Sequence, residues 1–346
     1  MTGTSPTAGT RTPALTFTLP CPDLGPWRAG NTGTEGVWQF DSGVPGRHVL
    51  ITALVHGNEL CGAWALLGLL QAGVRPQQGV LTLALCNLAA FDRFDTADHD
   101  ASRCVAEDMN RQWSHERLNP SPGTPLSPDR QRAIALRPFV QQADWLLDLH
   151  SMHERAAPLL LTGLHPRNVA LAQALGNPAH VVMDAGHTDG VRMRDFGRFG
   201  LPDDQAGDCR SLLIECGFHG DLSSRDVAQD MCIRFLLTAG TLNAADGQRL
   251  LPGWQLPDAP QQTLLTVTGA AVAHSERFGF VEPYQGLETI AQAGTVIGHQ
   301  DGLGLGEAVT TPHDDCVLVM PSVRQAKAGV TVVRFARAAD ALPTSN

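Results

Sequence analysis

The sequence lacks the excess of basic residues that a nucleic-acid-binding protein needs, since its 346 residues carry a formal net charge of −10. This global charge does not exclude a small anionic substrate, because a few local arginines can outweigh distant acidic groups. No uninterrupted apolar run approaches the length of a membrane span. The opening residues, MTGTSPTAGTRTP, lack the charged start and apolar centre of a signal peptide, and we predict a flexible tail over residues 1–30.

Paired cysteines and the motifs of several other enzyme classes are also missing. There is no C-x-x-C pair, no P-loop and no G-x-S-x-G nucleophile elbow. The glycine-rich residues 302–306 (GLGLG) lack the G-x-G-x-x-G spacing and are expected to form a hairpin loop. The eight cysteines are scattered, several within apolar runs, which predicts reduced thiols in a cytoplasmic protein: Cys21, Cys61, Cys86, Cys104, Cys209, Cys216, Cys232 and Cys316.

The most informative motif that is present is HGNE at residues 56–59. It lies between an apolar, β-branched run (48–55) and a helix-length apolar run (60–70). The end of a buried strand is where open α/β sheets place their ligand crevices, so His56 and Glu59 can offer zinc a nitrogen and an oxygen donor there. Taken alone this is a weak signal, because H-x-x-E occurs often by chance and a lone buried histidine is more often a core residue.

A third candidate ligand is His150, which follows the short apolar run of residues 145–149. Side chains alternate along a strand, so Asp148 and His150 share a face, and the Asp148 carboxylate could accept the second N–H of the imidazole. Three protein ligands with room for a water molecule are typical of a catalytic zinc site rather than a closed structural one. The pattern therefore predicts one zinc ion per chain.

Two further segments carry groups that hydrolysis would need. The apolar run 211–214 ends in Glu215, a carboxylate that is costly there unless it is used or paired, and that could move a proton from water to a leaving group. Residues 103–113 include Arg103, Asn110 and Arg111, and guanidinium groups suit the capture of a carboxylate or an oxyanion. For isolated residues, a solvent-facing glutamate and surface arginines without a role are the commoner cases.

Four motifs in order resemble the succinylglutamate desuccinylase/aspartoacylase family, relatives of the zinc carboxypeptidases: HGNE at 56–59, DMNR at 108–111, DLH at 148–150 and ECG at 215–217. The separation of Glu59 from His150 (150 − 59 = 91) is similar to that in this deacylase branch. The resemblance implies zinc bound by His56, Glu59 and His150, with Glu215 as general acid/base. It also implies that Asn110 and Arg111 grip a substrate carboxylate and that Arg103 polarises the scissile carbonyl.

Two departures from the family concern substrate recognition. Where aspartoacylases have a further arginine, ten residues before the acid/base glutamate, this chain has Gln205; nearby candidates to replace it are Arg192, Arg194, Arg198 and Arg210. Aspartoacylase also uses a tyrosine from its C-terminal domain, whereas this chain has only Tyr284, at a position that does not obviously correspond. Acyl-group and amino-acid specificity therefore stay open.

The order of elements predicts two domains after the tail. Over residues 31–250, strand-like and helix-like runs alternate, which predicts an α/β fold, a zinc-carboxypeptidase-like mixed sheet layered by helices. Glycine and proline gather near residues 251–260, and short alternating runs then predict a small C-terminal β domain over 260–340. The resemblance implies that this domain narrows the cleft and excludes large peptides. The strand-like runs are 48–55, 80–86, 144–149, 158–162, 179–183 and 211–215, and the helix-like runs are 60–71, 129–142, 167–175 and 224–239.

Together these features predict a zinc-dependent amidohydrolase that removes an acyl group from a small N-acyl amino acid or a related carboxylate-bearing amide. A carboxypeptidase-like peptidase or an esterase could use the same constellation. A binding protein without turnover is disfavoured by the intact set of three ligands plus Glu215. No nucleic acid or membrane partner is expected.

Overall fold

The computed structural model describes residues 15–187, 189–302 and 304–339. Their backbone falls into two compact units. The larger unit is built from Phe17–Met152 and Pro158–Leu264, and the smaller one from Leu265–Ala339 together with the segment His153–Ala157. No helix in the described ranges is both long and apolar enough to cross a membrane.

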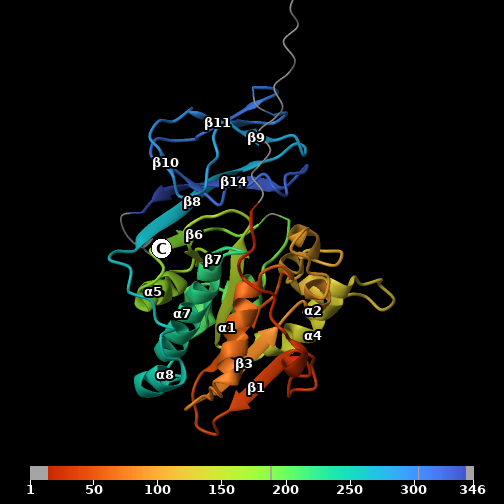
Figure 1. Ribbon diagram of the computed structural model, residues 1–346, viewed down its shortest axis with the longest axis vertical. Helices are drawn as coiled ribbons and strands as arrows, with labels where there is room; N and C mark the ends of the chain where they lie inside the picture. Colours follow the sequence, from red (N-terminus) through yellow and green to blue (C-terminus); the bar gives the residue numbers. More distant parts are fainter. Residues whose placement is uncertain (1–14, 188, 303, 340–346) are drawn as a thin grey trace, which may run out of the picture. The chain divides into compact units, whose positions relative to one another are not determined.

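Seven strands of a mixed sheet form the centre of the larger unit (Figure 1). Strands β3, β2, β4 and β7 are mutually parallel, whereas β1 and β5 run antiparallel to β3 and β7. This confirms the predicted mixed sheet. In spatial order the strands are β1 (Val37–Asp41), β3 (Val80–Leu85), β2 (His48–Ala53), β4 (Trp145–Met152), β7 (Arg210–Phe218), β5 (Leu159–Leu161) and β6 (His180–Met183).

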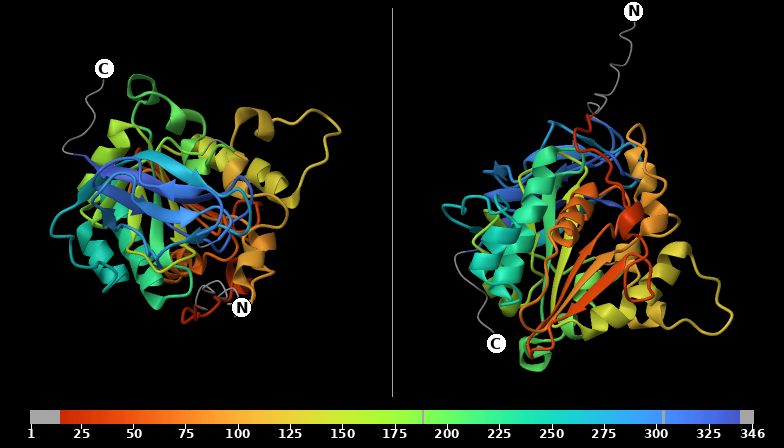
Figure 2. Two further views of the ribbon diagram at one scale, coloured as in Figure 1. Left: turned by 90° about the horizontal axis from the view of Figure 1, so that it is seen from above. Right: turned by 60° about the horizontal axis from the view of Figure 1, so that its bottom comes forward.

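Helices cover both faces of this sheet, as its apolar strands require. On one face α1 (Leu60–Gln71) packs beside α7 (Leu222–Thr238), which Figure 2 shows in its right-hand view. On the other, α4 (Pro128–Gln142) packs against Leu50 and Leu146 of β2 and β4. The remaining helices are α2 (Leu88–Phe91), α3 (His115–Leu118), α5 (Pro166–Leu175), α6 (Asp203–Ala206) and α8 (Ala244–Leu250), with 3₁₀ turns η1 (Gly25–Trp27), η2 (His99–Ser102), η3 (Met109–Arg111), η4 (Met193–Asp195) and η5 (Gly197–Gly200).

The start of the larger unit corrects the prediction of a flexible tail over residues 1–30. Residues 1–14 lie outside the described ranges, but from Phe17 onward the chain packs on the unit. Leu19 and Leu24 are buried, and the Trp64 indole of α1 donates a hydrogen bond of 2.8 Å to the carbonyl of Pro20. The polar, proline-rich composition of this stretch hid its two buried leucines.

In its described residues, the smaller unit contains β-strands and their connections. Its larger sheet orders β8 (Thr263–Val272), β14 (Thr331–Ala338), β13 (Cys316–Val319) and β10 (Thr289–Ile290), and its smaller sheet orders β12 (Ala308–Thr310), β11 (Val296–His299) and β9 (Gly279–Phe280). Phe278, Ile297 and Phe335 contribute to its core. Antiparallel β11 and β12 flank the glycine-rich residues 302–306, which agrees with the predicted hairpin, although residue 303 lies outside the described residues.

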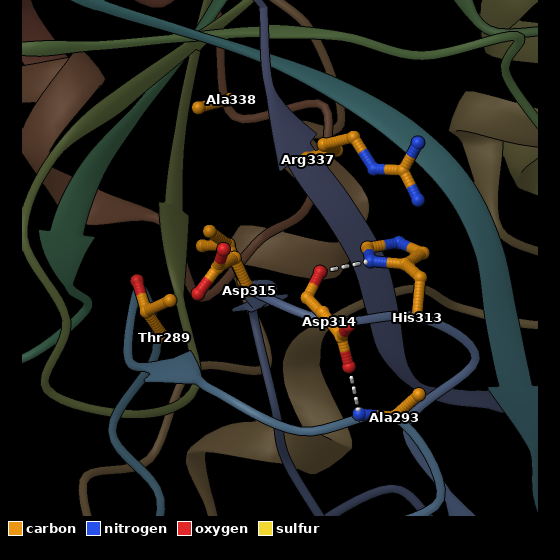
Figure 3. Close-up of a pocket in the computed structure, with 8 residues that line it drawn as sticks. Thr289, Ala293, His313, Asp314, Asp315, Arg337 and Ala338 are labelled. Atoms are coloured by element: carbon orange, nitrogen blue, oxygen red, sulfur yellow. Dashed lines mark hydrogen bonds between the residues drawn. The ribbon is translucent and has the colours of Figure 1, made fainter.

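An open hollow of about 570 Å³ lies on this smaller unit (Figure 3). Its lining includes His313, Asp314 and Arg337, and Asp314 accepts a hydrogen bond from the backbone of Ala293. None of the residues that line it belongs to the predicted metal site.

The substitution Gly62→Ala tests how closely α1 packs against the sheet. A Cβ at this position would lie 2.8 Å from Cβ of Leu149 and 2.9 Å from Cβ of Ala53, so Gly62→Ala should push the helix off β2 and β4. We expect a loss of about 1–3 kcal/mol in the free energy of unfolding, measured by urea denaturation. Gly247→Ala in α8 is the control: its Cβ would meet only side-chain atoms at 3.4 Å or more, and alanine should stabilise the helix by up to about 1 kcal/mol. Equal stability of the two variants would show that α1 is not closely packed there.

Candidate metal centre and substrate site

The HGNE turn is shaped by backbone features at the end of β2. Leu54, fully buried, has a φ of +59°, a left-handed conformation that is uncommon for a non-glycine residue and turns the chain sharply after Ala53. Gly57 follows, and its N–H donates a hydrogen bond of 3.1 Å to the carbonyl of Arg103. A Cβ at Gly57 would lie 2.5 Å from the Ser102 carbonyl oxygen, so only glycine lets the segment that carries Arg103 approach this turn.

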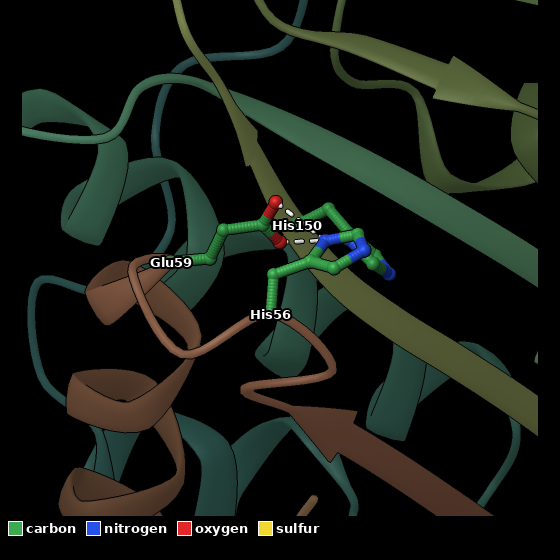
Figure 4. Close-up of side chains that lie close together, drawn as sticks. All are labelled: His56, Glu59 and His150. Carbon is green, nitrogen blue, oxygen red and sulfur yellow. Dashed lines mark hydrogen bonds and ion pairs between the residues drawn. The ribbon is translucent and has the colours of Figure 1, made fainter. Parts of the chain in front are cut away.

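The structure brings the three predicted ligands together in a buried cluster (Figure 4). The Glu59 carboxylate lies between the two imidazoles: Oε1 is 2.8 Å from Nδ1 of His56, and Oε2 is 2.7 Å from Nδ1 of His150. One donor atom from each residue falls within 4.8 Å of the others. His56 and Glu59 come from the turn between β2 and α1, and His150 comes from β4, whose carboxyl end lies beside that of β2.

A carboxylate stands behind each histidine. Nε2 of His150 is 2.9 Å from Asp148, as the alternation along the strand predicted, and Thr52 donates a hydrogen bond of 2.7 Å to Asp148. Nε2 of His56 lies 2.9 Å from Oδ1 of Asp108. In both imidazoles Nδ1 therefore faces Glu59 while Nε2 is oriented by an aspartate, the arrangement that fixes the tautomer of metal-binding histidines.

The charges of the cluster favour a cation at its centre. Burial would raise the pKa of Glu59, but the two imidazoles hold it well below its usual range. Burial would lower the pKa of His150, yet Asp148 and Glu59 raise it well above its usual value. With neutral imidazoles, the four carboxylates of Glu59, Asp108, Asp148 and Glu215 outweigh the two guanidinium groups of Arg103 and Arg111 and leave a net charge of −2 (−4 + 2), which a divalent ion would balance.

The donor set fits a metal ion in a further respect. Oε2 of Glu59 is buried, and its contact of 2.7 Å with Nδ1 of His150 does not have hydrogen-bond geometry. Buried polar atoms in this state are costly unless another group satisfies them. Two nitrogens and one carboxylate are the ligand types of catalytic zinc centres, which leave a coordination position open.

Glu215 lies beside this cluster on β7. It pairs in register with His150 of parallel β4, so the two side chains leave adjacent strands on the same face. Its side chain is largely buried, and it helps to raise the pKa of Arg103, for which burial acts in the opposite direction. The predicted acid/base residue thus stands next to a predicted ligand.

The arginines of residues 103–111 lie at different places around the site. Arg103 contacts Asp108 at 3.0 Å and Glu59 at 3.6 Å, so it reaches the ligand cluster itself. Arg111 is turned to a neighbouring loop, with Nε 3.0 Å from Asp189 and a terminal nitrogen 3.1 Å from Nδ1 of His187. Asn110 is buried, and its side-chain oxygen accepts a hydrogen bond of 2.9 Å from the N–H of Met193.

Each of the four arginines that could replace the one missing at Gln205 is engaged elsewhere. Buried Arg192 pairs with Asp184 and Asp195, and Arg194, also buried, donates to Thr162 and Ser211. Arg198 donates to the carbonyl of Ala143, and Arg210 to that of Cys209. In the smaller unit, Tyr284 packs edge-on against Phe280.

Sequence reasoning assigned no role to Asp108, Asp189 or His187. Asp108 could have been found, because it stands in the DMNR motif and a second carboxylate beside a ligand histidine is a common feature. Asp189 and His187 carry no such signal. They lie more than 70 residues after Arg111, and only the folded chain brings them to it.

Comparison with known proteins supports a family assignment. Residues 45–202 match the profile of the succinylglutamate desuccinylase/aspartoacylase catalytic domain. This segment is therefore similar to the catalytic domain of that deacylase family. It includes the three candidate ligands, Arg103, Asn110 and Arg111, whereas Glu215 lies beyond it. A search of curated protein sequences gave no significant match.

Solved structures show the same fold at low sequence identity. A succinylglutamate desuccinylase/aspartoacylase from Rhodobacter sphaeroides is 19% identical, with 86% of this chain and 87% of that chain covered and a TM-score of 0.60. The product-bound ectoine utilization protein EutE (DoeB) from Ruegeria pomeroyi is 18% identical over 84% and 85% of the two chains, with a TM-score of 0.57. A succinylglutamate desuccinylase from Vibrio cholerae is 16% identical over 88% and 86%, with a TM-score of 0.58.

Asp108→Asn tests the contact behind His56. The amide keeps the shape but removes the charge that orients the imidazole and balances Arg103, so affinity for added zinc should fall about 10–100-fold in competition with a chelator. Glu107→Gln is the matched control, because the neighbouring Glu107 pairs with Arg117 and Ser127 instead. Unchanged zinc affinity in Asp108→Asn would remove Asp108 from the metal centre.

Proposed function

We propose that this protein is a zinc-dependent amidohydrolase that removes an acyl group from a small N-acyl amino acid or a related carboxylate-bearing amide. The observation that carries the proposal is the buried cluster of His56, Glu59 and His150, with Glu215 in register beside His150. The family match of residues 45–202 favours deacylation over the cleavage of terminal peptide bonds or esters by the same centre.

In this proposal His56, Glu59 and His150 hold one zinc ion, which when bound supplies a Lewis acid for the amide carbonyl and lowers the pKa of water. Glu215 takes a proton from the attacking water and delivers it to the nitrogen of the departing amine. Arg103, which lies 3.6 Å from Glu59, offers its guanidinium to the developing oxyanion. Asp148 and Asp108 keep the two imidazoles in the tautomers that leave Nδ1 available.

Substrate selection is assigned to Asn110 and Arg111. Arg111 offers a planar fork to a substrate carboxylate, and Asn110 offers its amide nitrogen, since the amide oxygen is bonded to Met193. Asp189 and His187 share the Arg111 guanidinium, so an incoming carboxylate has to compete with Asp189. A cytoplasmic location remains a prediction, supported by eight cysteines that are all free thiols.

Turnover decides between an active enzyme and a binding protein. Purified protein should hydrolyse members of a panel of N-acyl amino acids that varies acyl chain and amino acid, with matched esters and dipeptides for comparison. Treatment with a chelator should abolish turnover, and added zinc should restore it. Hydrolysis of the dipeptides alone would replace the proposed activity with that of a peptidase.

Glu215→Gln isolates the acid/base step. Glutamine keeps the shape of the side chain but cannot accept the proton, so kcat should fall by about 10²–10⁴ while bound zinc is retained. Zinc content and single-turnover rates provide the measurement, with Glu116→Gln on the exposed surface as the control. A normal rate in Glu215→Gln would mean that another group moves the proton.

Arg111→Ala tests recognition of the carboxylate. The loss of a charge-assisted, bidentate contact should cost about 2–5 kcal/mol in kcat/KM for an N-acyl amino acid, and much less for its carboxamide analogue. Arg111→Lys should rescue only partly, because it lacks the planar fork. Asp189→Asn provides the opposite change: removing the competing carboxylate should lower KM for the anionic substrate. Equal losses for both substrates in Arg111→Ala would make Arg111 a structural residue.

A further inference from the structure

The pairing of β4 with β7 becomes irregular directly after Glu215. His150 pairs with Glu215, and the next pair along is Met152 with Phe218. Between these pairs β4 contributes one residue and β7 two, so β7 contains a bulge at 216–217. Such bulges bend a strand and re-aim neighbouring side chains, often next to active sites.

The backbone conformation at 216–217 is compatible with a bulge that bends β7. Gly217 has a φ of +104°, in the region that favours glycine. Because Glu215 immediately precedes the bulge, the direction of its carboxylate depends on how the bulge is held. Two contacts from His219 hold it.

A buried hydrogen bond spans the bulge. Oγ of Ser151, the single residue of β4 opposite the bulge, lies 2.8 Å from Nδ1 of His219. The backbone N–H of His219 also donates a hydrogen bond of 3.0 Å to the carbonyl of Met152. The exposed fractions of Ser151 and His219 are 4% and 0%, so little water can substitute for either contact. Ser151 directly follows the ligand His150, and the bond thus joins the ligand strand to the strand of Glu215.

Aromatic rings enclose this hydrogen bond. The His99 ring lies 6.2 Å from that of His219, centroid to centroid, and Phe17 lies 4.7 Å from His99 and 5.6 Å from Phe218. His99 begins η2, the turn that leads to Arg103. These aromatic rings therefore also contact the segment that carries Arg103, the second side chain proposed to act in catalysis.

The N-terminal segment closes the cluster. The N–H groups of Thr18 and Leu19 both donate to the carbonyl of Gly220, at 2.6 and 2.8 Å. A Cβ at Gly220 would lie 2.9 Å from Cα of Phe17, so glycine is needed for this approach. Residues 17–19, which the sequence predicted to be part of a flexible tail, thus hold the turn after β7.

We propose that His219 is a positioning residue for Glu215, acting through its hydrogen bond to Ser151 across the bulge. This inference rests on the proposed function, in which Glu215 moves the proton. His219 and Ser151 touch neither substrate nor metal in this account. They fix the end of β7 so that the Glu215 carboxylate faces the cluster of His56, Glu59 and His150.

The test separates positioning from folding and from metal binding. Ser151→Ala and His219→Leu each remove the bond, and kcat should fall up to about 10²-fold while KM and zinc content change little. His219→Asn, which keeps an amide group near the place of Nδ1, should recover most of kcat. The double variant Ser151→Ala/His219→Leu should be no slower than the worse single variant, because both remove one interaction.

Amide hydrogen exchange provides a readout that does not depend on turnover. Protection of residues 216–220 should fall in Ser151→Ala and His219→Leu and recover in His219→Asn. Ser211→Ala is the control: it removes a buried hydroxyl from the other end of β7, and should lower stability without changing kcat or exchange at 216–220. Normal kcat or normal exchange in both bond-removing variants would overturn the inference. If the unaltered protein hydrolyses no substrate, the proposed function falls, and the exchange data still decide whether this bond holds the bulge.

Discussion

The Glu59 carboxylate, placed between two buried imidazoles, is the interaction on which the rest of the site depends. It contacts His56 and His150 at 2.8 and 2.7 Å with almost no exposure to water. Ionised groups are stable in such a place only when they are paired or bound to a metal. Asp148 and Asp108 behind the histidines, and Arg103 beside Glu59, meet part of this requirement, and the remaining negative charge is what makes a divalent cation the natural occupant.

The sheet explains how these groups come together. Strands β2, β4 and β7 are adjacent and parallel, so their carboxyl ends share one edge, where the HGNE turn, His150 and Glu215 follow in that order. Close packing keeps the edge compact: Gly62 lets α1 approach the strands, and Gly57 lets the segment with Arg103 approach the turn. The fold thus supplies positions, and the chemistry depends on which side chains occupy them.

The sequence allowed strands β2, β4 and β7 and the clustering of the candidate ligands to be predicted because their signals are local. Apolar runs define β2, β4 and β7, and alternation along β4 alone places Asp148 with His150. What could not be predicted depends on contacts between distant segments. Asp189 meets Arg111 only after folding, and the N-terminal segment was taken for a tail because its polar composition outweighs Leu19 and Leu24, which are buried. The residues that select the substrate also depend on such distant contacts. No motif identifies an arginine that replaces the one missing at Gln205, or a role for Tyr284.

Solved structures at 16–19% identity share this fold, so the fold alone does not test the proposed chemistry, and the metal centre does. The most direct measurement is a crystal structure with anomalous diffraction recorded on both sides of the zinc absorption edge. We expect one zinc peak per chain, about 2.0–2.2 Å from Nδ1 of His56, Nδ1 of His150 and a carboxylate oxygen of Glu59. A fully loaded protein with its zinc elsewhere, or bound through Nε2 of either histidine, would contradict it.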